Sequence, residues 1–173
     1  MINKTFRKII LGLTIVFLIL GFISIPTNPA YAEIRTIEEG ENQVVYQSRQ
    51  KLFDSYNRTW QAIAFQRITS EGKEPFTIRL AGFPGRTEID HSQPLTVKMP
   101  TGETFYAKDI SKKAFVDKSP AGNIGQYDFE EIISELPNTL AVVFSLPIID
   151  GKNLEMPVSP LSIQEWKEVA QKR

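Results

Sequence analysis

Glu88, Asp90 and His91 form the densest group of potentially reactive side chains in this sequence. Carboxylate oxygens and an imidazole nitrogen can coordinate a divalent cation or move a proton during hydrolysis. If residues 87–91 are extended, however, the two carboxylates lie on one face and the imidazole projects from the other. The pattern therefore favours a structural interpretation: Asp90 accepts an Asx hydrogen bond from Ser92, and His91 is a half-exposed strand residue.

The residues needed for nucleophilic catalysis are scarce. His91 is the only histidine, and the chain has no Gly-x-Ser-x-Gly nucleophile elbow. Cysteine is absent, which excludes disulfides, thiolate metal sites, a catalytic thiol and a lipidated N-terminal cysteine. We therefore expect no catalytic residue, no metal and no cofactor, and a protein that is not an enzyme. The alternative is a metal-dependent or hydrolytic enzyme centred on Glu88, Asp90 and His91.

Other polar and aromatic residues are candidates for binding. Arg86, Glu88, Asp90 and His91 are the first group, placed together by the turn that precedes them. Lys112, Lys113 and Lys118 lie in the Gly- and Pro-containing stretch 111–126, which we interpret as a long surface loop. They suit contact with an anion or a partner, although charged loops are usually only solvated. Trp60 and Trp166 can stack on a sugar, but each completes an apolar stripe and is expected in the core.

A strand and a turn must position the first binding group. Phe76, Ile78 and Leu80 alternate with smaller or polar residues, the pattern of a strand with one buried face. Phe83-Pro84-Gly85-Arg86 follows, with proline and glycine at the two central positions of a type II turn. Gly85 then needs a positive φ, and Gly82 just before the turn can relieve crowding or form a bulge.

The first 32 residues differ from the rest of the chain. Lys4, Arg7 and Lys8 precede an apolar run from Ile9 to Ile25, with no acidic residue in the segment. Ala30-Tyr31-Ala32 then matches the small-x-small pattern that signal peptidases cleave. We expect a signal peptide, 1–32, cleaved before Glu33; an uncleaved membrane anchor is the alternative.

Charge and length limit the class of the mature chain. The full chain has 20 basic and 20 acidic residues; loss of the three basic residues of the signal peptide gives a formal charge of −3. Nucleic acid is therefore an unsuitable partner, because phosphate binding needs a basic surface. The remaining length fits a flexible lead-in, 33–42, and a single β-rich domain, 43–173, which can bury a core without disulfides.

Most of the domain has sequence patterns typical of β-strands. Alternating or apolar runs occur near residues 44–48, 51–53, 58–68, 76–80, 95–99, 104–107, 140–146 and 154–158. Residues 129–136 and the C-terminal segment from Ser162 carry helical stripes behind capping-box patterns. We expect a mainly β fold, an antiparallel sandwich or half-open barrel of about seven or eight strands, with one short internal helix and a C-terminal helix.

Several short blocks carry a resemblance to a known family; the most specific are Gly82-Phe-Pro-Gly85 and Glu88-Ile-Asp-His91, with Trp60-Gln-Ala62 and Gly125-Gln-Tyr-Asp128 in support. From about Val44 to Trp166 the chain resembles a cyanobacterial family of exported proteins, domain of unknown function number 3122. The resemblance implies a cyanobacterial source and a location in the periplasm or thylakoid lumen. It implies no activity.

The expected function follows from export and from the missing catalytic groups. We expect a non-enzymatic binding or accessory module of the periplasm or thylakoid lumen that contacts a membrane-protein complex. After processing it should have no transmembrane segment and should not bind nucleic acid. The ligand, the partner and the oligomeric state are left open by the sequence.

Overall fold

The computed structural model describes residues 34–40, 42–115 and 119–173, all within the unit Ala32–Arg173. The expected signal peptide, 1–32, and Lys118 lie outside the described residues. Among the helices that are described, none has the length and apolar character needed to cross a membrane.

The larger of two antiparallel sheets is built around a long hairpin. In this hairpin β2 and β3 are antiparallel: Val44 lies opposite Ile68 at one end, and Phe53 lies opposite Thr59 at the other. Buried alanines of β3 let the core pack closely on the hairpin. The strand order is β1-β2-β3-β5-β8, with β4 also paired to β3. The bounds are β1 Arg35–Glu38, β2 Val44–Phe53, β3 Thr59–Thr69, β4 Gly72–Lys73, β5 Thr77–Ala81 and β8 Ile124–Asp128.

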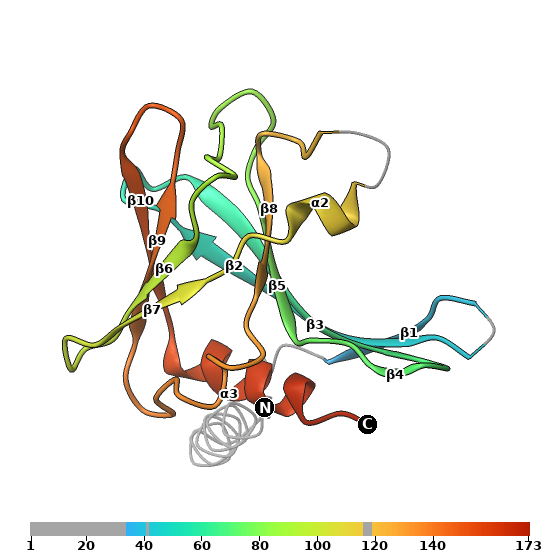
Figure 1. Ribbon diagram of the computed structural model, residues 1–173. Helices are drawn as coiled ribbons and strands as arrows, with labels where there is room; N and C mark the ends of the chain where they lie inside the picture. The colour runs from blue at the N-terminus through green and yellow to red at the C-terminus, as the bar shows by residue number, and fades with distance from the viewer. Residues whose placement is uncertain (1–33, 41, 116–118) are drawn as a thin grey trace, which may run out of the picture. The chain divides into compact units, whose positions relative to one another are not determined.

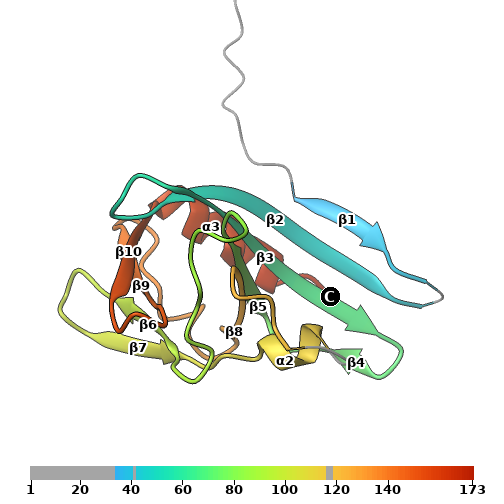
Figure 2. The same cartoon turned by 90° about the horizontal axis from the view of Figure 1, so that it is seen from above.

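The second sheet has the order β10-β9-β6-β7 and is also antiparallel. Its strands are β6 Leu95–Lys98, β7 Thr104–Ala107, β9 Val142–Pro147 and β10 Asn153–Val158. The two sheets face each other as a sandwich, while the far ends of β2 and β3 continue past the second sheet toward β1 and β4 (Figures 1 and 2). The expected mainly β, antiparallel sandwich is thus confirmed, with more short strands than the sequence pattern indicated.

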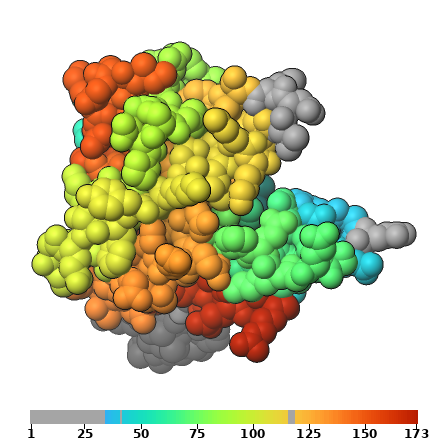
Figure 3. Space-filling model, in the orientation of Figure 1, coloured from blue at the N-terminus to red at the C-terminus, as the bar shows by residue number. Residues whose placement is uncertain are grey.

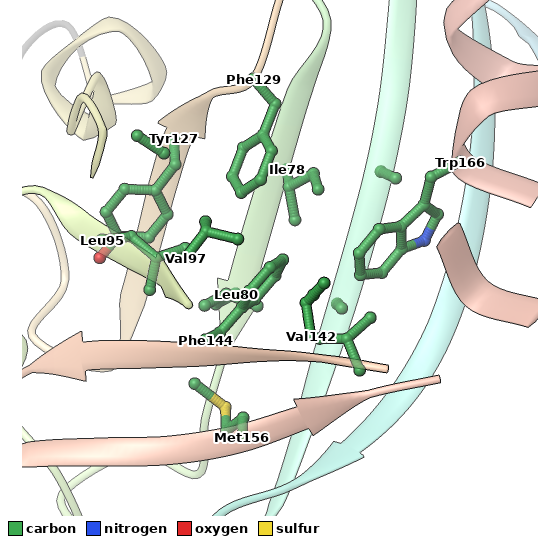
Figure 4. Close-up of a cluster of buried hydrophobic side chains, with 14 of the residues drawn as sticks. Ile78, Leu80, Leu95, Val97, Tyr127, Phe129, Val142, Phe144, Met156 and Trp166 are labelled. Atoms are coloured by element: carbon green, nitrogen blue, oxygen red, sulfur yellow. The ribbon is translucent and has the colours of Figure 1, made fainter. Parts of the chain in front are cut away.

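A single aromatic and aliphatic core fills the space between the sheets and the C-terminal helix. Ile78 and Leu80 of β5 and Phe144 of β9 are fully buried, and Figure 4 shows their side chains converging. The Phe144 ring stacks on the Trp166 indole with centroids 5.8 Å apart. Trp60 and Trp166 are 1% and 0% exposed, so both tryptophans are core residues, as expected.

The C-terminal helix α3, Pro160–Ala170, begins earlier than the capping-box pattern indicated. Its N-cap is Ser159, whose hydroxyl accepts the Ser162 backbone N–H at 3.1 Å, and Pro160 occupies the first helical turn. Proline is favoured there because its missing N–H has no intrahelical partner. Ile163, Trp166 and other apolar residues of one stripe are buried, so the expected helix and its buried face are confirmed.

The expected helix at 129–136 is absent: these residues form successive hydrogen-bonded turns. The N–H groups of Ile132 and Ile133 both bond to the Phe129 carbonyl, at 3.0 and 2.9 Å. Glu130 turns away and accepts the Phe76 backbone N–H at 2.7 Å. The apolar stripe is still buried. Hydrogen bonds to Phe76 hold the start of the segment, and Pro137 stops a helix from continuing beyond it.

The described parts of the stretch 111–126 contain regular structure where a long surface loop was expected. It begins with the short helix α2, Ser111–Ala114, and ends in β8. One edge of β8 pairs with β5, and its other edge bonds to the segment before α2, through Ile110 N–H to Gln126 at 2.8 Å. Glycine and polar residues hide this strand from a periodicity analysis. In the expected lead-in, residues 35–38 form β1 along the edge of β2.

Candidate functional site

Three loops meet at one end of the sandwich: the β2–β3 turn, residues 82–92, and the β9–β10 turn (Figure 1). Figure 3 shows the last two side by side on the surface. Backbone hydrogen bonds join them: Asp90 N–H donates to Pro147 at 3.0 Å, and Ile149 N–H donates to Glu88 at 3.0 Å. Because two rigid sheets carry these loops, their side chains are held in fixed relative positions.

Asp54 organises the β2–β3 turn. Its carboxylate accepts the backbone N–H groups of Tyr56 and Arg58, each at 2.9 Å. It also accepts Arg58 Nε at 2.8 Å and Trp60 Nε1 at 3.0 Å. Burial acts to raise the pKa of Asp54, but these hydrogen bonds together hold that pKa below its ordinary value. Asp54 therefore remains ionised and fixes Arg58 at the surface.

The turn after β5 has the geometry that its sequence predicts. Arg86 N–H donates to the Phe83 carbonyl at 3.3 Å, and Gly85 has φ +71°. Gly82 N–H donates to the Asn123 carbonyl at 2.8 Å, and Asn123 Nδ2 donates back to the Gly82 carbonyl at 2.9 Å. The turn is therefore tied to the segment before β8, which limits how far Phe83 and Arg86 can move.

Two adjacent hollows lie between these loops. One has a volume of about 410 Å³ and extends toward the β9–β10 turn; the other has about 370 Å³ and reaches Trp60. Arg58, Arg86 and Thr87 line both hollows. We call the two together the end groove. Each volume lies in the range of small ligand-binding clefts, about 300–1,000 Å³.

Large apolar side chains stand exposed around the end groove. Tyr56, Phe83 and Ile149 are 63%, 71% and 65% exposed, and each lines one of the hollows. Arg58 Cζ lies 4.9 Å from the Tyr56 ring centroid, a cation–π contact that orders both side chains. Aromatic residues and arginine are the types most enriched in the energetic centres of protein interfaces.

The structure separates the expected binding residues. Arg86 and Glu88 both line the end groove. Asp90 instead caps a turn: its carboxylate accepts the Ser92 N–H at 3.0 Å and the Ser92 hydroxyl at 2.5 Å. These two hydrogen bonds hold the pKa of Asp90 below its ordinary value. The expected Asx bond is therefore confirmed.

The imidazole of His91 pairs with Asp109, a residue that the sequence patterns did not indicate. Its Nδ1 lies 2.9 Å from Asp109 Oδ2, and the other Asp109 oxygen accepts the Ser111 N–H at 2.7 Å. Within the described ranges, no cluster of three or more histidine and acidic side chains is arranged to hold a metal ion. Glu88, Asp90 and His91 consequently have three different environments.

Lys112 and Lys113 lie exposed on α2, next to β8 and away from the residues that line the end groove. Among the groove residues that the sequence patterns did not indicate, four have large exposed or half-buried side chains: Tyr56, Arg58, Phe83 and Ile149. The sequence holds only a weak indication of them. Each is a large side chain in or beside a turn, where it is expected to be exposed and thus available for contact.

Comparison with known proteins identifies a family without a known activity. A family model described as a protein of unknown function, DUF3122, matches residues 32–169. No curated protein and no solved structure matches the chain significantly.

Proposed function

Since this chain belongs to the DUF3122 family, for which no function is known, we propose from the geometry that it is a non-enzymatic binding module. The end groove receives a segment of a partner protein. The observation that supports this most directly is the group of three exposed apolar side chains, Tyr56, Phe83 and Ile149, beside Arg58 and Arg86. Exposed apolar patches with arginine at their centre are typical of protein-contact surfaces.

The end groove is suited to a partner because its walls are already in place. Asp54 fixes Arg58, and the paired hydrogen bonds between Gly82 and Asn123 fix the turn that carries Phe83 and Arg86. A preformed surface loses little conformational entropy when it binds. Glu88 and Asp150 add negative charge beside the arginines, so the proposed partner segment carries apolar side chains flanked by charges of both signs.

The proposal extends to location. The basic, apolar and small-x-small segments of residues 1–32 support export. The resemblance to a cyanobacterial family suggests the periplasm or the thylakoid lumen as the destination. There the module would serve a membrane-protein complex as an accessory component. N-terminal sequencing of the isolated protein tests export: we expect the chain to begin at Glu33, and a chain that begins at Met1 contradicts it.

The test of binding uses a photo-activated cross-linking residue at position 83 and, as a control, at position 106. Tyr106 on β7 is 66% exposed and does not line the end groove. In solubilised membranes of the source organism, position 83 should cross-link one protein that position 106 does not. That protein, once purified, should bind the unmodified chain, and Phe83→Ser or Tyr56→Ser should weaken binding about tenfold or more.

Tyr106→Ser is the matched control, because it removes an equally exposed aromatic ring elsewhere on the domain. It should leave the affinity unchanged within about twofold. Equal weakening by Tyr106→Ser and Phe83→Ser, or cross-linking from position 106 alone, overturns the assignment of the groove.

A further inference from the structure

Three arginines on neighbouring strands share the face of the larger sheet that points away from the core. Arg49 of β2 pairs in register with Ile63 of β3, which pairs with Arg79 of β5. Arg67 follows Ile63 by four residues on β3, so strand alternation places it on the same face. Ala62, next to Ile63, is fully buried in the core. We call Arg49, Arg67 and Arg79 the arginine cluster.

Phe65 forms the floor of the arginine cluster. The guanidinium carbons of Arg67 and Arg79 lie 5.8 and 5.5 Å from the centroid of its ring. The ring is 7% exposed, although its face of the sheet is turned away from the core. Planar guanidinium groups stack on aromatic rings while their N–H groups stay available at the edges. Phe65 therefore holds two positive charges close together.

Neutral amide oxygens are the recorded partners of two of these arginines. Arg79 donates from Nε and Nη2 to Gln126 Oε1, at 3.1 and 2.7 Å. Arg49 donates from Nε to Gln47 Oε1 at 3.3 Å. An amide oxygen accepts a hydrogen bond but does not cancel a charge. Within the part of the chain that the structure describes, neither arginine forms an ion pair.

Arg67 has carboxylate partners at its two terminal nitrogens but not at Nε. Its Nη2 lies 3.1 Å from Glu39 Oε2, and its Nη1 lies 3.5 Å from Glu74 Oε2. Its Nε is buried and has no hydrogen-bond partner among the described residues. A buried donor without an acceptor is costly, so the groups around Arg67 leave its guanidinium incompletely satisfied.

The positive charges of the three arginines also repel one another. Burial, with the positive charges of Arg67 and Arg49, lowers the pKa of Arg79, while Glu39 acts in the opposite direction. Arginine nevertheless stays protonated in proteins. The repulsion is therefore present in the folded domain, and an anion placed among the three guanidinium groups would relieve it.

We propose that Arg49, Arg67 and Arg79 bind one oxyanion of the phosphate or sulfate type, either free in solution or carried on a lipid headgroup. The planar donor forks of arginine match the oxygens of such a group in pairs. The site is distinct from the end groove, because none of the three arginines lines it. It adds an anion-binding function that does not depend on the proposed protein partner.

Calorimetric titration of the protein, isolated after expression of the full chain, tests the site with inorganic phosphate and, separately, inorganic sulfate. Vesicle flotation, with phosphatidylcholine alone or mixed with phosphatidylglycerol, tests the lipid-borne form. Arg79→Gln and Arg49→Gln should each weaken binding about tenfold or more, because each removes charge-assisted donors. The matched control is Arg173→Gln at the exposed C-terminus, which should change binding less than about twofold.

If the protein binds phosphate or sulfate and the two cluster variants weaken that binding, the ligand is a free anion. If the protein floats only with vesicles that contain phosphatidylglycerol and the variants weaken flotation, the ligand is a lipid headgroup. Phe83→Ser should leave either form of binding unchanged, which separates this site from the end groove. If Arg79→Gln fails to fold, the exposed Arg49→Gln decides alone. No binding in any assay, or equal weakening by Arg173→Gln, overturns the proposal.

Discussion

Gly82 lies directly against the indole of Trp60. A Cβ atom at position 82 would come within 2.8 Å of Trp60 Cη2 and 2.9 Å of Cζ3. The indole cannot move away easily, because it is 1% exposed and its Nε1 donates to Asp54. The Gly82–Trp60 contact therefore joins the floor of the end groove to the turn that carries Phe83 and Arg86.

Gly82→Ala should destabilise the domain by about 1–3 kcal/mol, the usual cost of overpacking a filled site. Chemical unfolding measures this. In the double variant with Trp60→Leu the total loss should be smaller than the sum of the two single losses, because the clash is removed. Gly85→Ala is the comparison: its φ of +71° strains a side chain, but nothing lies within 4 Å, so Trp60→Leu should not rescue it. Additive effects of Gly82→Ala and Trp60→Leu contradict the steric explanation.

Asp54→Asn should lower the free energy of unfolding at neutral pH by about 2 kcal/mol, since charged acceptors form the stronger hydrogen bonds. The pKa of Asp54 in the folded state is below its ordinary value of 3.8. Its stabilising contribution is therefore complete above that value and is lost as the pH falls through the lower, folded-state pKa. The difference between wild type and Asp54→Asn should thus shrink in acid; a constant difference down to about pH 2 contradicts this linkage.

Trp166→Ala should cost about 3–5 kcal/mol, the range for emptying a large core site. Its indole is fully buried and stacks on Phe144. Leu161→Ala, on the same helix but 71% exposed, should change the stability by less than about 0.5 kcal/mol. Similar unfolding midpoints for the two variants would show that α3 does not stabilise the sandwich.

Tyr127→Phe should leave the stability unchanged or raise it slightly. The Tyr127 hydroxyl is buried and has no hydrogen-bond partner among the described residues, so its removal loses no recorded bond. Burial, with the charges of Asp109 and Asp90, raises the pKa of Tyr127 above 10.0. The folded state therefore favours the neutral hydroxyl, and its contribution to stability is complete below pH 10 but is lost as the pH rises further. Tyr127→Phe should consequently unfold less readily than wild type in strong alkali.

Tyr106→Phe, which removes an exposed hydroxyl, is the control for this comparison. A loss of more than about 1.5 kcal/mol in Tyr127→Phe at neutral pH would reveal a hydrogen-bond partner such as a buried water.

Local patterns in the sequence were enough to predict the class of the fold. Strand alternation, turn residues and the apolar stripe of the C-terminal helix each act over a few residues, so they can be read without knowledge of distant contacts. Gly85 at its positive φ and the Asp90–Ser92 turn are examples. The cysteine-free composition excluded whole classes of site in the same way.

Local patterns did not predict the structure of β8 or of residues 129–136. β8 carries a glycine and polar residues, and it is a strand because β5 and the segment before α2 both pair with it. Residues 129–136 have a helical stripe, yet tertiary contacts bury that stripe in turns instead. Backbone pairing and burial between distant segments outweighed local propensity in both cases.

By itself the sequence determined most of the longer strands, the turns around Gly85 and Asp90, the C-terminal helix and the residues able to do chemistry. Only the tertiary structure decided which of those residues meet. It brings Tyr56 and Arg58 to Arg86 and Ile149, and it pairs His91 with Asp109 rather than Asp90. The reason is physical: periodicity specifies which way a side chain points from its own strand, whereas strand register and loop contacts, set by long-range packing, specify what it faces.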